Sequence, residues 1–378
     1  MPESVGEREN VRWKVELPGR GPAGPIVVGN RVIVAGSSGH NQDRLHVNCY
    51  DAGSGKQLWH RQFWATGSTL THPFVANAGP TPASDGRRVF ALFSSNDLIC
   101  LDLDGNLEWL RGLTVDFPNA RNDVGLSSSP VAAGKSVIVQ IENQSDSFAA
   151  GIDAVTGETR WRIERNRGPN WASPAVARGA GPDNDVVLLQ SPNQLTAHDA
   201  DSGRQLWSYD KPCATISSPA ALAGRVYVPS AGVTALEPGS SPEPPKTLWT
   251  SGALQPANAS IVLGGEKLYA LNRSGVLACA AAETGKVLWR LRLEGTHWGT
   301  PVLVGSRLYA INQDGGVQVV DVSGTRGRQV SKGSFGERIL STPAVAGDAM
   351  YVRSDRYLWK IAAAEAQQAR PASQRRSK

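Results

Sequence analysis

The chain has 378 residues and a formal net charge of +5, with 40 glycines, 24 prolines and 40% apolar residues. Most of this charge lies in residues 363–378, where four basic residues oppose Glu365, so the rest of the chain is close to neutral. A near-neutral body lacks the basic surface on which nucleic-acid binding depends. No apolar stretch approaches the ~20 residues that span a membrane. We therefore expect no nucleic-acid partner and no transmembrane segment.

The chain begins with a lead, residues 1–9, that lacks the apolar run of a secretion signal. Residues 10–17 follow as a predicted strand. Its Trp13 is the first of seven tryptophans that recur every 40 to 52 residues, namely Trp13, Trp59, Trp109, Trp161, Trp207, Trp249 and Trp289. Most of them close the same segment, as in Ile152-Asp-Ala-Val-Thr-Gly-Glu-Thr-Arg-Trp161. A period of this size with Gly turns is typical of the four-stranded blades of a propeller.

Each repeat also has a characteristic opening, in which a small polar residue and a proline precede an apolar run, a Gly turn and a second apolar run. Proline suits the first residue of a strand, and the glycine indicates a tight hairpin. The openings number eight: Pro25, Pro82, Pro130, Pro174, Pro219, the proline-less Ala259, Pro301 and Pro343. The endings also number eight, because a degenerate copy near Val330 adds to the seven tryptophans.

The order of these segments predicts how the ring closes. The chain starts with an ending and finishes with an opening, so the strand in residues 10–17 must complete the blade that begins at Pro343. Such closure removes the free edges that an open sheet exposes. We predict one all-β domain over residues 10–362, a closed eight-bladed propeller of four-stranded blades. We expect residues 363–378 to be a disordered basic tail and the protein to be a monomer.

The repeat Asp-Ala-x-Thr-Gly-x-x-x-Trp resembles the tryptophan-docking repeat of the propeller family named after pyrroloquinoline quinone (PQQ), over residues 10–362. The opening Glu9-Asn-Val-Arg-Trp13 looks like the non-catalytic branch, which includes the propeller lipoprotein of the outer-membrane β-barrel assembly machinery. The other branch contains the PQQ-dependent alcohol dehydrogenases. The resemblance implies a periplasmic or extracellular protein. Each repeat Trp is expected to insert between neighbouring blades and to donate its N–H to a backbone carbonyl there.

The features of a catalytic site are missing from the sequence. The dehydrogenase branch holds PQQ between a Trp floor and a vicinal Cys–Cys disulfide, with Ca²⁺ bound by Glu and Asn. None of the four cysteines here is adjacent to another, and residues 119–123 are the one oxygen-rich cluster that stands out. There is no Gly-x-Ser-x-Gly elbow or phosphate loop, and the histidines lack metal-ligand spacing. We therefore expect no catalytic residue, no metal and neither PQQ nor Ca²⁺ as cofactor.

The connections between blades provide the candidate binding surface. In a propeller they gather on one face around the central channel, and two of them are long, residues 61–80 and 110–127. Their aromatic, amide and charged groups are typical of binding surfaces. The candidate binding residues on this long-loop face are His72, Asn77, Arg121, Asn122, Asp123, Trp171, His297, Trp298 and Arg338. Alternatively, Trp171 and Trp298 plug the channel as core residues, and His72 and His297 make only local loop hydrogen bonds.

Three classes of function remain open. We favour a non-catalytic binding or scaffolding propeller that recognises a protein segment or a glycan on the long-loop face. One alternative is a PQQ- or metal-dependent oxidoreductase, which needs a flat gap above an indole with convergent oxygen ligands. The other is a hydrolase or lyase that uses a pair such as His72 and Asp123.

Overall fold

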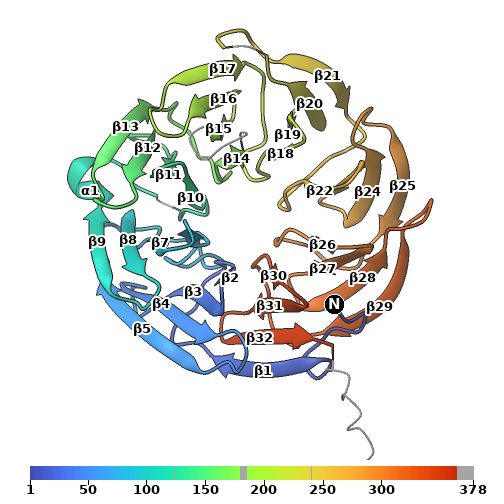
Figure 1. The fold of residues 1–378 in the computed structure, drawn as a ribbon, viewed down its shortest axis with the longest axis horizontal. Helices are drawn as coiled ribbons and strands as arrows, with labels where there is room; N and C mark the ends of the chain where they lie inside the picture. Colours follow the sequence, from blue (N-terminus) through green and yellow to red (C-terminus); the bar gives the residue numbers. More distant parts are fainter. Residues whose placement is uncertain (123, 179–184, 240, 364–378) are drawn as a thin grey trace, which may run out of the picture.

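The computed structural model describes residues 1–122, 124–178, 185–239 and 241–363. These residues form eight four-stranded sheets that follow one another around a ring (Figure 1). Neighbouring strands within each sheet are antiparallel, as Val131↔Ile138 in blade three illustrates. The described residues include one short helix, α1 (Leu113–Asp116), and none of their helices could span a membrane. The predicted all-β, eight-bladed propeller is confirmed, and the predicted disordered tail lies almost entirely outside the described residues.

The blades are numbered in chain order, and each runs from its inner to its outer strand. Blades one to four contain β2 (Ile26–Val28), β3 (Arg31–Ser38), β4 (Arg44–Asp51) and β5 (Gln57–Trp64); β6 (Ala83–Ser84), β7 (Arg88–Leu92), β8 (Asp97–Asp102) and β9 (Leu107–Gly112); β10 (Val131–Ala133), β11 (Ser136–Ile141), β12 (Phe148–Asp153) and β13 (Thr159–Glu164); β14 (Ala175–Ala177), β15 (Val186–Ser191), β16 (Gln194–Asp199) and β17 (Gln205–Tyr209). Blades five to eight contain β18 (Ala220–Leu222), β19 (Arg225–Val228), β20 (Val233–Glu237) and β21 (Lys246–Ser251); β22 (Val262–Gly264), β23 (Lys267–Leu271), β24 (Val276–Ala281) and β25 (Val287–Arg292); β26 (Val302–Val304), β27 (Arg307–Ile311), β28 (Gly316–Asp321) and β29 (Arg328–Ser334); β30 (Ala344–Ala346), β31 (Ala349–Arg353), β32 (Tyr357–Ala362) and β1 (Val11–Glu16).

Burial explains the sequence of each strand type. The two middle strands of a blade are covered by both neighbouring blades, and β11 is accordingly buried along its whole length. The outer strands are covered on one face only, so β13 alternates, with Trp161 buried between the exposed Arg160 and Arg162. Continuous apolar runs and alternating runs therefore mark the middle and outer strands respectively.

The ring closes through pairing between the two ends of the chain. Strand β1 lies antiparallel to β32, with Trp13 opposite Lys360 and Glu16 opposite Tyr357. Blade eight thus takes its inner three strands from the C-terminal region and its outer strand from the N-terminal region (Figure 1). This arrangement confirms the predicted closure.

The tryptophan of each outer strand packs against the turn of the next blade. In blade three, Trp161 Nε1 donates to the carbonyl of Ala200 in blade four at 2.9 Å. Gly203 in that turn has φ 70, and a Cβ there would lie 2.6 Å from the Trp161 ring, so only glycine fits. The same hydrogen bond is made by Trp13, Trp59, Trp109 and Trp249, while Trp207 and Trp289 are equally buried.

Strand registers correct two details of the repeat. The residue before β22 that stands where other blades have proline is Ile261, not Ala259, because Ser260 takes the small polar position. In blade seven the position of the docking Trp is Ser331, not Val330. Ser331 pairs with Val319, as Trp289 pairs with Cys279, and Val330 is the bulged residue.

The lead, residues 1–9, packs where blade seven lacks a tryptophan. Val5 is fully buried in the apolar cluster between blades seven and eight, which contains Trp359. Tyr309 Oη donates to the carbonyl of Pro2 at 2.9 Å, and the N–H of Glu7 donates to the carbonyl of Ser334 at 2.8 Å. A docking Trp would have no turn to contact here, because blade eight has the two chain ends in place of that turn. The lead fills the space instead.

We predict that Trp161→Ala lowers the free energy of unfolding by about 3–5 kcal/mol, because it empties a buried aromatic site. Denaturant titration measures this change. Trp64→Ala is the matched control: Trp64 is 60% exposed, and its loss should cost less than about 1 kcal/mol. Equal losses in the two variants would contradict the docking role.

A second prediction concerns the lead. Deletion of residues 1–9 should lower the melting temperature, because it uncovers the apolar cluster around Val5. Adding Ser331→Trp to the deletion should raise the melting temperature again, since an indole then fills the same space. Arg8→Ala, at an exposed position, is the control and should change little. If Ser331→Trp lowers the stability of the deletion variant further, the lead does not replace a docking Trp.

Candidate binding site at the mouth of the central channel

Seven side-chain hydroxyls form a chain of hydrogen bonds around the channel. Ser129 Oγ accepts the N–H of Thr81 at 2.9 Å, and Ser173 Oγ accepts the N–H of Ser129 at 2.9 Å. The pattern continues through Ser218, Ser260, Thr300 and Thr342. Each of these residues stands two positions before the inner strand of its blade, so together they form a hydroxyl ring at the end of the channel where the inter-blade connections arrive.

The hydroxyl ring is interrupted between blades eight and one. Gly24 occupies the eighth position and has no side chain to accept a hydrogen bond, although its N–H donates to Thr81 Oγ1 at 2.9 Å. At the same junction Arg353, 1% exposed, donates to the carbonyls of Ala23 at 2.9 Å and Ala35 at 2.6 Å. Burial lowers the pKa of Arg353 to about 10, so the guanidinium stays charged at neutral pH. Charge-assisted hydrogen bonds from Arg353 to two carbonyls of blade one thus connect the two blades where the hydroxyl is missing.

A cavity of about 570 Å³ lies against the hydroxyl ring. Its volume falls within the range of cavities that bind small molecules. All seven ring residues line it. The other lining residues are Pro22, His72, Phe74, Val75, Gly79, Val124, Ser127, Trp171, Ile216, Asn258, Trp298 and Leu340. The described lining therefore combines hydroxyls with apolar and aromatic walls and contains no Lys, Arg, Asp or Glu.

Two of the predicted tryptophans form walls of this cavity. Trp171 Nε1 donates to the carbonyl of Gly125 at 3.1 Å, and Trp298 Nε1 donates to Gln313 Oε1 at 3.1 Å. Both indole N–H groups are thus engaged, and the rings present apolar surface to the cavity. Trp298 is 41% exposed and Trp171 is half-buried. They line the channel mouth and leave open space beside them, so they are not fully buried core plugs.

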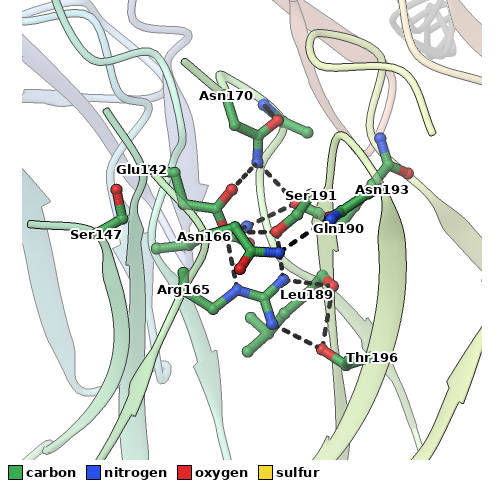
Figure 2. A network of polar contacts seen from close by, with 12 residues as sticks. Glu142, Ser147, Arg165, Asn166, Asn170, Leu189, Gln190, Ser191, Asn193 and Thr196 are labelled. Atoms are coloured by element: carbon green, nitrogen blue, oxygen red, sulfur yellow. Dashed lines mark hydrogen bonds and ion pairs between the residues drawn. The ribbon is translucent and has the colours of Figure 1, made fainter. Parts of the chain in front are cut away.

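A buried ion pair helps to place Trp171. Figure 2 shows Arg165 and Asn170 converging on Glu142 between blades three and four. Arg165 Nε donates to Glu142 Oε1 at 2.8 Å, and the two side chains are 2% and 0% exposed. Asn170, next to Trp171, donates to Glu142 Oε2 at 3.1 Å and to the carbonyl of Gln190 at 2.7 Å. The network holds the connection that carries Trp171.

Four lining residues outside the hydroxyl ring come from the connection between β5 and β6, which begins after Trp64 and not at residue 61. His72 and Phe74 stack with ring centroids 5.6 Å apart, and His72 Nδ1 accepts the N–H of Phe74 at 3.2 Å. Arg338 lies over the Phe74 ring at 5.3 Å and forms an ion pair with Asp355 at 2.9 Å. Phe74 is nevertheless 53% exposed. His72, Phe74 and Arg338 are thus brought together at the mouth.

Arg338 does not itself line the cavity, and neither do Asn77 and Asn122. Asn77 is fully buried and bonds to the Ser95 N–H and the Gln42 carbonyl, while Asn122 donates to the Ser94 carbonyl. The structure therefore places these two amides on loop backbone groups and away from the cavity, unlike the arrangement expected from the sequence.

His297 and Arg121 also stay outside the cavity lining. His297 is 7% exposed, and burial lowers its pKa to about 4, so its ring is neutral at pH 7. Arg121 is exposed on its loop. Asp123 lies outside the described residues.

The residues at this site do not fit PQQ and Ca²⁺. PQQ is a planar tricarboxylate, and anions of this kind bind to cationic groups, yet the described lining is uncharged. No group of three or more His, Cys, Asp or Glu side chains gathers within the described residues. The cysteines are free, including Cys49 and Cys100, which occupy equivalent positions opposite docking tryptophans. The sequence-based expectation of no cofactor remains a prediction.

Comparison with known proteins identifies a family whose model matches most of this chain. Residues 6–145, 43–227 and 233–371 match the model of the family described as outer membrane protein assembly factor BamB. The Shewanella oneidensis protein of that name is 23% identical over 301 residues, which span 72% of this chain and 71% of that protein.

Solved structures with the same fold come from both branches. BamB from Moraxella catarrhalis has a TM-score of 0.66 at 17% identity, covering 93% of this chain and 96% of that chain. A quinohemoprotein alcohol dehydrogenase from Comamonas testosteroni has a TM-score of 0.69 at 12% identity, covering 97% and 79%. At these low sequence identities the two structures show that the fold is shared. They do not show whether this chain is a scaffold or an enzyme.

We predict that Glu142→Gln lowers the free energy of unfolding by about 3 kcal/mol, because it leaves the Arg165 charge buried without its partner. Urea titration measures the change. Glu294→Gln is the matched control, because it breaks an ion pair on the surface. The side chains of Glu294 and Lys332 are 67% and 49% exposed, and exposed pairs contribute at most about 1 kcal/mol to stability. Similar losses in both variants would show that the buried pair does not stabilise this connection.

Proposed function

The chain belongs to the family described as outer membrane protein assembly factor BamB, and we propose on this basis that it is a non-catalytic scaffold in outer membrane protein assembly. We propose that it acts in the periplasm, the aqueous compartment that adjoins this membrane. Its protein partners would bind to the long-loop face. A closed ring of eight sheets suits this role, since it holds loops in a fixed arrangement.

The observation that carries the proposal is the exposed apolar rim of the cavity. Phe74, Val124 and Trp298 are 53%, 48% and 41% exposed, and all three line the same cavity. Exposed apolar groups gathered around a pocket are typical of protein interaction sites, and aromatic anchors contribute most of the binding energy there. A polypeptide segment that covers this rim would bury these side chains against a rigid support.

The alternatives have less support from the site. An oxidoreductase would need the charged groups that the described lining lacks. A hydrolase that used His72 as a base would need an unprotonated ring nitrogen that is free to take a proton. Nδ1 accepts the Phe74 N–H at 3.2 Å, so the neutral ring carries its proton on Nε2 and neither nitrogen is free for this role. A glycan on the long-loop face is the remaining binding alternative, and the experiment below distinguishes it.

The test is cross-linking of tagged protein in its native host, followed by purification and mass spectrometry. Wild type should capture proteins of outer membrane assembly, and the double variant Phe74→Ala with Trp298→Ala should reduce their yield at least tenfold, because both anchors are lost. Trp64→Ala is the control and should capture these proteins as wild type does. Trp64 is 60% exposed on the outer strand β5 and does not line the cavity.

Three outcomes would count against the proposal. If the double variant captures the same proteins as wild type, the partners bind to a surface other than the channel mouth. A calorimetric titration with PQQ and Ca²⁺ that gave one tight site per chain, abolished by Trp171→Ala, would identify a quinone enzyme. Saturable binding of oligosaccharides with no captured protein would favour the glycan alternative.

A further inference from the structure

The hydroxyl ring forms the polar floor of the cavity, and its hydroxyl hydrogens can be donated to a ligand. Each oxygen of the hydroxyl ring accepts a backbone N–H from the preceding blade, as Ser218 Oγ does from Ser173 at 2.9 Å. Within the described residues, none of the seven hydroxyl hydrogens is donated to another protein group. The floor therefore offers O–H donors to whatever occupies the cavity.

The walls above this floor are apolar. Ile216 and Leu340 line the cavity together with the ring surfaces of Trp171 and Trp298, whose N–H groups are engaged elsewhere. The described lining has no charged side chain, so an ammonium or carboxylate that entered would lose its hydration without gaining a counter-charge. An uncharged group with an apolar body and a polar tip matches both walls and floor.

We propose that the cavity receives a tyrosine side chain from the bound polypeptide segment. This inference rests on the proposed function and specifies its partner. The aromatic ring packs between the indoles and the aliphatic walls, and the phenol oxygen accepts hydrogen bonds from the hydroxyl ring. The cavity of about 570 Å³ is larger than one side chain, so the backbone that flanks the tyrosine enters the mouth as well.

Blocked pentapeptides, acetyl-Gly-Gly-X-Gly-Gly-amide, test this inference on the intact protein by calorimetry or ligand-observed NMR. The tyrosine peptide should bind about five- to tenfold more tightly than the phenylalanine peptide, which lacks the phenol hydrogen bond. Peptides with lysine or glutamate at X should show no saturable binding. If they bind as tightly as the tyrosine peptide, the inference is wrong.

Two matched double variants isolate the hydroxyls. The threonine variant, Ser218→Thr with Ser260→Thr, keeps both hydroxyls, and threonine already occupies the equivalent positions Thr81, Thr300 and Thr342. The valine variant, Ser218→Val with Ser260→Val, has the same side-chain shape without the hydroxyls. The threonine variant should keep the preference for tyrosine over phenylalanine, while the valine variant should reduce it to less than about twofold. A purely structural role would lower the melting temperature of the valine variant without changing this preference.

Other outcomes separate the inference from the proposed function. If the valine variant does not fold, the peptide series on wild type still decides the question. Failure of all peptides, with cross-linking to assembly proteins still dependent on Phe74 and Trp298, would overturn the tyrosine inference and leave the scaffold function standing. Maltose that displaced the tyrosine peptide and bound more tightly than it would show a saccharide site instead.

Discussion

Closure of the ring by β1 on β32 is the constraint on which the rest of the structure depends. The pairing joins residues at opposite ends of the chain, such as Glu16 and Tyr357, and turns a three-stranded blade with a free edge into a complete one. Each blade is buried between two neighbours, so a gap at one junction would expose the middle strands on both sides of it. The same closure sets the number of blades and therefore the width of the channel that the hydroxyl ring surrounds.

Two departures from the repeat lie at this junction and at the one before it. Blade seven has Ser331 in place of the docking Trp because blade eight has chain ends where the other blades have a turn. Gly24 interrupts the hydroxyl ring at the next junction, where the buried Arg353 spans from blade eight to blade one. The missing docking Trp of blade seven thus has a physical cause, which is that closure is made by two strands not joined by a turn.

Much of the fold could be predicted from the sequence, because docking tryptophans, Gly turns and apolar runs report local requirements that recur in each blade. The register near Ser331 could not, since a bulge shifts the outer strand by one residue and valine looks more like a docking residue than serine. The candidate site was predicted in part. Aromatic residues such as Trp298 could be found because few roles other than packing or binding explain them in a loop. Asn77 and Asn122 satisfy loop backbone groups, and the sequence alone does not distinguish this role from ligand binding.

The split of blade eight between strands far apart in the sequence has a consequence for how the protein folds. Strand β1 precedes all the other strands in the chain, yet its partner β32 follows all of them. Contacts of such long range slow folding, because a large loss of chain entropy precedes them. Until they form, the folding chain carries an unpaired strand and an uncovered blade edge, which are the features that favour aggregation. Pairing of β1 with β32 is therefore the step at which an exposed intermediate becomes a closed ring.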